Sequence, residues 1–207
     1  MVCLEVAKVQ QCLVHLIIHR KNMKINEIIV AIVLTLIAAN SCSASPSKFS
    51  EGDVIFIESQ SSQSPYIRLV QGSKWTHCGI IVNTSNGLQV LEASKTVRLT
   101  PINTFISRSK SGFKVVSPKS PLKPIKYQKY LGIPYDLEFK FNNGKFYCSE
   151  LVYQIYKDQG ITLTYPKKVS DYWFTRIPKI RTIMKKRNIQ MNQEVVSPKD
   201  IYQSFLW

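Results

Sequence analysis

The chain has 207 residues and a formal net charge of +15, from 28 Lys and Arg against 13 Asp and Glu. With 44% hydrophobic residues it can form a packed core, which excludes a disordered chain. The charge favours anionic partners. However, the densest basic clusters, at 167–168 and 185–187, have no nucleic-acid-binding motif beside them, so a solvated basic surface and no nucleic acid partner are expected.

The amino-terminal part has the order of an export signal. A lysine follows Met23, residues 28–39 form an apolar run, and small residues follow up to Ala44. This order is typical of a secretory signal, and the apolar run is short for a transmembrane span. We therefore expect residues 1–44 to be a signal peptide or membrane-targeting segment and residues 45–207 to form the domain. The domain would then be periplasmic or associated with the cell envelope.

Two processing routes stay open at this stage. Signal peptidase could cut after Ala44, or Cys42 could become the lipidated first residue of a lipoprotein. Without residues 1–44, His77 is the only histidine and Cys78 and Cys148 are the only cysteines. No CxxC pair occurs, so no structural zinc site is expected.

Strands precede one long helix in the predicted domain. Residues 66–71 fit a helical turn or a strand equally well. In chain order the other predicted elements are a strand at 54–57, a loop at 59–66, a strand at 75–82, a tight primed turn at Asn86-Gly87, strands at 88–93 and 97–100, a helix at 102–107, a strand at 113–116, and helices at 125–131 and 146–159. This arrangement predicts an α+β fold.

Cys148 is the first candidate for chemistry, because it lies in the first turn of the long predicted helix. The positive end of a helix dipole lowers the pKa of a thiol, and the free N–H groups of that turn can bind an oxyanion. A cysteine there could also be buried and inert. Position alone leaves both readings open.

The hairpin supplies a base and a carboxylate. His77 lies on a predicted strand with Gly79 on the same face, and Glu92 lies on the returning strand. The turn between them brings His77 and Glu92 roughly opposite each other, where a carboxylate can fix the tautomer of an imidazole. The rival carboxylates are Asp53, Asp136 and Glu150.

Cys78 follows His77, so its side chain is expected on the opposite face of the sheet, in the core. The rival expectation is a disulfide between Cys78 and Cys148, which would prevent any chemistry at Cys148.

Five segments in this order resemble the permuted NlpC/p60 group, which includes the YaeF/YiiX papain-like amidases: EGDVIF at 51–56, THCGIIV at 76–82, VLEA at 90–93, YD at 135–136 and FYCSELV at 146–152. The resemblance implies a circularly permuted papain-like fold, with an antiparallel sheet or small barrel packed against the helix that carries the nucleophile. It further implies that Cys148 attacks an amide or ester carbonyl, His77 acts as its base and Glu92 orients His77. No metal or cofactor is implied.

Three hypotheses follow from these observations. The first is a cysteine hydrolase (a thiol amidase or peptidase) that cleaves amide bonds, in particular those of cell-wall-derived peptides. The second is an acyl hydrolase or acyltransferase acting on lipid or N-acyl substrates. The third is a non-catalytic module that binds the anionic cell wall or a membrane surface, and a Cys78–Cys148 disulfide would favour it.

Overall fold

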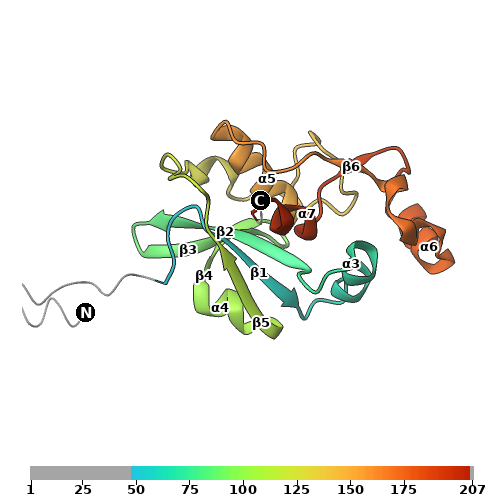
Figure 1. Cartoon of the computed structure of the whole chain (residues 1–207), viewed down its shortest axis with the longest axis horizontal. Helices are drawn as coiled ribbons and strands as arrows, with labels where there is room; N and C mark the ends of the chain where they lie inside the picture. The colour runs from blue at the N-terminus through green and yellow to red at the C-terminus, as the bar shows by residue number, and fades with distance from the viewer. Residues whose placement is uncertain (1–47, 206–207) are drawn as a thin grey trace, which may run out of the picture. The chain divides into compact units, whose positions relative to one another are not determined.

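Five strands form one antiparallel sheet in the computed structural model, which describes residues 48–205. The order across the sheet is β4-β3-β2-β1-β5 (Figure 1). Because β1 pairs with both β2 and β5, the first strand of the chain lies inside the sheet. The strands are β1 (Val54–Ser59), β2 (His77–Thr84), β3 (Gly87–Ala93), β4 (Val97–Pro101) and β5 (Ser109–Val116).

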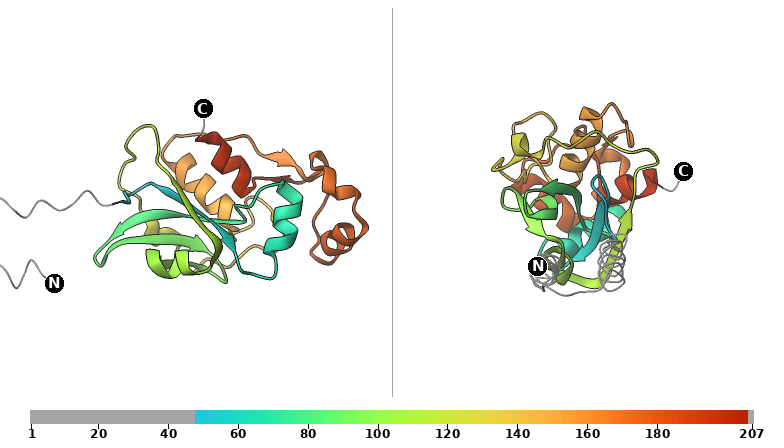
Figure 2. Two further views of the ribbon diagram at one scale, coloured as in Figure 1. Left: turned by 60° about the horizontal axis from the view of Figure 1, so that its bottom comes forward. Right: turned by 90° about the vertical axis from the view of Figure 1, so that its left-hand side faces the viewer.

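Helices cover both faces of this sheet. Helix α5 (Cys148–Asp158) and helix α7 (Pro198–Ser204) lie on one side, and helix α4 (Ile102–Ser107) lies on the other (Figure 2). The α5 side buries Val54, Phe56, Ile80, Val82 and Leu91 against Leu151, Val152 and Ile155. The α4 side buries Ile55, Ile57, Ile81 and Val90 against Phe105.

A strand buried on both faces needs apolar side chains at every position, not at alternate ones. This explains the uninterrupted apolar runs at residues 54–57 and 80–82, both of which are fully buried. The predicted α+β fold, with an antiparallel sheet packed against the helix that begins at Cys148, is confirmed.

The β2–β3 hairpin has a different turn from the predicted one. Thr84 pairs with Gly87, so Ser85 and Asn86 form the turn. Among these residues only Gly87 has a positive φ, of 87°. A primed turn would need positive φ at its central residues, so the prediction of a primed turn at Asn86-Gly87 was wrong, although a hairpin is present.

Two other local predictions were partly wrong. The predicted loop at 59–66 ends early, because helix α3 (Ser64–Gln71) begins there and also settles the ambiguity at 66–71. Pro65 stands in the first turn of α3, where proline suits the helix because its missing N–H has no partner to lose. The helix predicted at 125–131 is only a 3₁₀ helix, η1 (Tyr127–Tyr130).

The carboxy-terminal part contains elements that the sequence pattern did not predict. These are the strands β6 (Lys167–Lys168) and β7 (Glu194–Val195), the 3₁₀ helices η2 (Val169–Asp171) and η3 (Trp173–Arg176), and helix α6 (Pro178–Lys186). Together with α3 they enclose a third apolar cluster, which includes Val169, Phe174, Ile180 and Met184. This cluster lies apart from the two that pack against the sheet.

The predicted segment 1–44, including Cys42 and the apolar run at 28–39, lies outside the described residues. Its role as an export signal therefore stays a prediction. Within residues 48–205, none of the helices has the length and apolar character needed to cross a membrane.

Candidate active site

Cys148 is the first residue of α5, and Tyr147 caps the helix in an extended conformation. The thiol is not part of a disulfide and its residue is only 4% exposed. Below it, Leu151 and Val152 anchor the helix in the core. The helix is therefore fixed by burial, and its free amino end holds the thiol.

His77 contacts both other members of the predicted constellation. Its Nε2 lies 2.7 Å from Glu92 Oε2, and its ring makes a hydrogen bond with the Cys148 thiol. Because Nε2 faces the carboxylate, Nδ1 is the nitrogen left for the sulfur. The ring also stacks on Phe105 of α4 at a centroid distance of 5.4 Å, which restricts its rotation.

Gly79 makes the His77–Glu92 contact feasible. The register of β2 and β3 continues from Ile80–Leu91, so Glu92 lies opposite Gly79 and diagonal to His77. The side chains of His77 and Glu92 therefore lie next to Gly79 on the same face of the sheet. The predicted contact is therefore present, but it runs diagonally across a position without a side chain.

Glu92 is fully buried and is held by three further donors. Its Oε1 accepts hydrogen bonds from Thr100 Oγ1 at 2.6 Å and from the Arg108 guanidinium at 2.7 Å. Arg98, which pairs with Glu92 across β3 and β4, adds a contact at 3.3 Å. We call Arg98, Thr100 and Arg108 the clamp. Glu92 Oε1 accepts from the clamp, and Oε2 binds His77. Sequence reasoning missed this clamp, although Arg98 and Thr100 lie two residues apart on a predicted strand.

Cys78 is buried in the core, as expected, and it also contacts Cys148. Its thiol and its backbone N–H both make hydrogen bonds with the Cys148 sulfur. The sequence did not predict this contact. Both cysteines are free, so the structure does not contain the rival Cys78–Cys148 disulfide.

The protonation equilibria favour a charged pair. The hydrogen bond from Cys78 is the largest influence on the pKa of Cys148, and with His77 it outweighs burial and holds that pKa well below the value of a free thiol. Burial alone would lower the pKa of His77, but hydrogen bonds with Cys148 and Glu92 raise it to about 9. Both shifts favour the charged form of the pair, in which Cys148 is a thiolate and His77 an imidazolium.

Glu92 stays ionised beside this pair. Burial alone would raise the pKa of its carboxyl, but hydrogen bonds from His77, Thr100 and Arg108 hold it far below the ordinary range. A fixed negative charge at Nε2 stabilises the imidazolium form of His77.

The rival carboxylates have other partners, and none of the hydrogen bonds among residues 48–205 joins them to His77. Asp53 accepts from the Ser50 N–H at 2.8 Å, and Asp136 accepts from the N–H groups of Glu138 and Lys140. Burial raises the pKa of Glu150 to about 8, so this residue is largely protonated at neutral pH. Of the four carboxylates, only Glu92 orients the imidazole.

A family model matches residues 48–207, and it describes the permuted papain-like amidase enzymes YaeF/YiiX of the C92 family. The chain belongs to this family. It is also 30% identical over 165 residues to the uncharacterized protein YiiX of Escherichia coli K12, an alignment that covers 74% of this chain and 81% of YiiX. The family supports a hydrolase that acts on amides.

The fold of this C92 member is similar to a solved structure. The crystal structure of YiiX from Escherichia coli O157:H7 matches with a TM-score of 0.67 and 30% identity, and covers 74% of this chain and 91% of that one. That YiiX is described as a metalloprotein. Within the described part of this C92 member, no group of three or more His, Cys, Asp or Glu side chains is arranged to hold a metal ion.

Gly79→Ala should disturb the contact between His77 and Glu92 in this C92 member, because it forces apart the two strands that carry them. An alanine Cβ would lie 2.5 Å from Val90 Cγ1 and 2.9 Å from the Leu91 carbonyl oxygen, so β2 and β3 must separate. We expect a loss of about 1–3 kcal/mol in the free energy of unfolding, measured with urea. Hydrolysis of a chromogenic acyl ester should fall by roughly 10²-fold in kcat/KM, because His77 moves away from Glu92.

Gly87→Ala is the matched control in the same hairpin. No atom lies within 4 Å of the added Cβ, but Gly87 has a φ of +87°. This variant should lose about 1–2 kcal/mol of stability through backbone strain and keep its kcat/KM. Full activity in Gly79→Ala would show that the close approach at Gly79 does not position His77.

Proposed function

We propose that this chain is a cysteine hydrolase that cleaves amide bonds, with Cys148 as nucleophile, His77 as acid and base, and Glu92 as the group that orients His77. The observation that carries the proposal is the position of His77. Its ring makes one hydrogen bond with the Cys148 thiol and another with Glu92 Oε2. A nucleophile, a base within reach and an orienting third group are the parts that thiol catalysis needs.

The reaction would proceed in two steps through a thioester. The Cys148 sulfur forms a bond to the carbonyl carbon, the carbon–nitrogen bond breaks, and the His77 imidazolium gives its proton to the departing amine. Water then attacks the thioester, His77 takes a proton from it, and the acid leaves with Cys148 restored as a thiolate. In this mechanism the free N–H groups in the first turn of α5 would bind the developing oxyanion.

A thiolate–imidazolium pair has a distinctive pH dependence. The pKa of Cys148 is lowered and that of His77 is raised to about 9, so the pair persists between these two values. We expect the rate of alkylation of Cys148 by iodoacetamide to be already high at neutral pH, to fall only in acid, and to change little from neutral pH up to about 8. Hydrolysis should decline above about pH 9, where His77 loses the proton that the leaving group needs.

The labelled peptide must be identified by mass spectrometry. Cys78 is fully buried and burial raises its pKa, so it should stay unlabelled in the folded protein. The protein in denaturant is the control, because there both thiols should react with the pH dependence of an ordinary cysteine. If Cys148 in the folded protein titrates like an ordinary thiol, the proposed mechanism is wrong.

A further inference from the structure

Arg108 contacts two of the groups that hold His77. Its guanidinium donates to Glu92 Oε1 at 2.7 Å, and its Cζ lies over the Phe105 ring, 5.1 Å from the ring centroid. Glu92 and Phe105 both contact His77, the first at 2.7 Å through Nε2 and the second as a stacked ring. Arg108 therefore acts on the imidazole by two routes, each through one intermediate side chain.

The backbone of Arg108 is fixed where α4 ends and β5 begins. Its N–H donates to the Phe105 carbonyl oxygen at 3.3 Å, and its own carbonyl oxygen accepts from the Gln60 N–H at 3.1 Å. The side chain starts from this fixed point and reaches Glu92 on β3. The guanidinium thus links the end of α4 to the strand that carries the orienting carboxylate.

The guanidinium of Arg108 is oriented for Glu92 and not for its own hydrogen bonding. Its Nε is buried and has no hydrogen-bond partner among residues 48–205. A buried N–H without a partner destabilises a fold. The orientation that brings Nη2 to Glu92 therefore leaves another donor of the same group unpaired. Such a cost is typical of a side chain whose position is set by a site.

Arg98 makes a weaker contact with the same carboxylate oxygen. Its Nε and Nη2 each lie 3.3 Å from Glu92 Oε1, and its side chain is 46% exposed, against 33% for Arg108. Solvent and side-chain mobility weaken an ion pair that is open to water. Of the two arginines, Arg108 is therefore the stronger constraint on Glu92.

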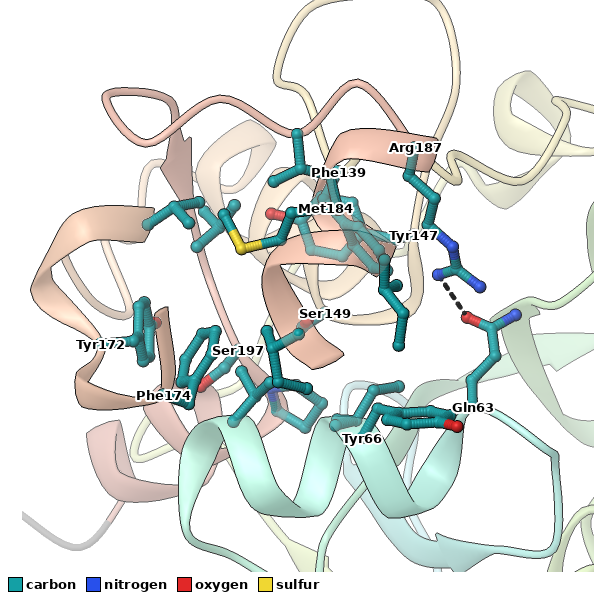
Figure 3. Close-up of a pocket in the computed structure, with 18 of the residues that line it drawn as sticks. Gln63, Tyr66, Phe139, Tyr147, Ser149, Tyr172, Phe174, Met184, Arg187 and Ser197 are labelled. Atoms are coloured by element: carbon teal, nitrogen blue, oxygen red, sulfur yellow. Dashed lines mark hydrogen bonds between the residues drawn. The ribbon is translucent and has the colours of Figure 1, made fainter. Parts of the chain in front are cut away.

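The cavity beside Cys148 is lined by other residues. Its volume is about 520 Å³, and its walls include Tyr66 of α3 and Met184 of α6 (Figure 3). Neither Arg108 nor Glu92 is among the residues that line it. A change at Arg108 should therefore alter the orientation of the imidazole and leave the walls of this cavity as they are.

We propose that Arg108 is a positioning residue that holds His77 in the orientation that proton transfer needs. This rests on the proposed function, since it concerns the imidazole that acts as acid and base. Arg108 and Thr100 occupy Glu92 Oε1, so that Oε2 is directed to the ring. The guanidinium also keeps Phe105 stacked against the imidazole. A displacement of about 1 Å in such a site can lower the rate by roughly 10²-fold.

The test is chemical rescue of Arg108→Ala with the guanidinium ion. The side chain of Arg108 is 33% exposed, so its removal leaves a space that a small cation can enter from solvent. With p-nitrophenyl acetate as substrate, we expect kcat to fall by about 10- to 100-fold and KM not to rise. Guanidinium at millimolar concentrations, far below those that unfold proteins, should restore much of kcat and saturate. Urea has the same planar shape without the charge and should not.

Three further variants control this experiment. Arg108→Lys keeps the charge but not the planar fork, and should recover part of kcat. Arg98→Ala should lower kcat by less than about fivefold, because its contact is longer and more exposed. Arg68→Ala is the matched control, because Arg68 also pairs with a strand carboxylate, that of Glu58 at 2.6 Å, and it should leave kcat unchanged.

The outcomes separate this inference from the proposed function. Native kcat in Arg108→Ala, or a loss of kcat that neither guanidinium nor Arg108→Lys restores, would show that Arg108 does not position His77. Equal restoration by urea would show that the space needs only to be filled, which also contradicts the proposal. In each of these cases activity still depends on Cys148 and the proposed function stands. If ester hydrolysis persists in Cys148→Ala, the proposed function itself fails.

Discussion

Cys148→Ala is expected to lower kcat/KM for acyl esters and amides by at least about 10⁴-fold, because it removes the atom that forms the thioester. The residue is 4% exposed at the start of α5, and an alanine there keeps the helix and fits the space. The free energy of unfolding should therefore change much less than the activity. Steady-state kinetics and urea unfolding of the same preparation measure both.

Cys148→Ser is the matched control for this experiment. It keeps a hydroxyl at the same position beside His77 and Cys78, so its hydrogen bonds and packing are the closest to those of the native thiol. A serine hydroxyl is not ionised at neutral pH, and we expect its activity to be nearly as low as that of Cys148→Ala. Activity close to the native level in either variant would place the reaction elsewhere in the molecule.

Glu92→Gln is expected to lower kcat/KM by about 10²- to 10⁴-fold with the thiol still present. The amide removes the negative charge that faces His77 Nε2 at 2.7 Å, and its NH₂ group can favour the wrong tautomer of the ring. The pKa of His77 should then fall and that of Cys148 should rise. The alkylation rate of Cys148 measured across pH should show its acid limb displaced to higher pH.

The fold should survive Glu92→Gln. Arg98 and Arg108 lose their partner, but their side chains are 46% and 33% exposed and can be hydrated instead. Glu58→Gln is the matched control, since Glu58 is also a strand carboxylate bound by an arginine and a hydroxyl, at Arg68 and Ser111. The hydrogen bonds of its carboxylate go to Arg68 and Ser111 and not to His77, so the substitution should leave both kcat/KM and the alkylation profile as they are. An unshifted profile in Glu92→Gln would contradict the role given to this carboxylate.

The site could be predicted largely because its parts follow local rules. Cys148 precedes a helix whose apolar residues repeat at helical spacing, so its place in the first turn was readable from the pattern. A short turn joins the strands of His77 and Glu92, which limits their separation to a few alternatives of register. Export, if it occurs as expected, leaves His77 as the only imidazole.

Local rules could not predict the clamp around Glu92 or the contact between Cys78 and Cys148. Arg108 follows α4 and reaches back over the sheet to Glu92, sixteen positions earlier in the chain. Cys78 meets Cys148 only because α5 packs on that face of β2. Both contacts depend on how whole elements are stacked, and neither has a period or spacing that marks it.

By itself the sequence determined the α+β order, the hairpin that pairs His77 with Glu92 and the helix that begins at Cys148, since each depends on periodicity or a turn within a short stretch of chain. Only the tertiary structure decided the cavity. Its walls bring α3, near the start of the domain, against α6 and β7, more than a hundred residues later. The apolar side chains of these elements look like ordinary core residues along the chain, and whether they close on one another or leave a space for a ligand is settled by packing alone.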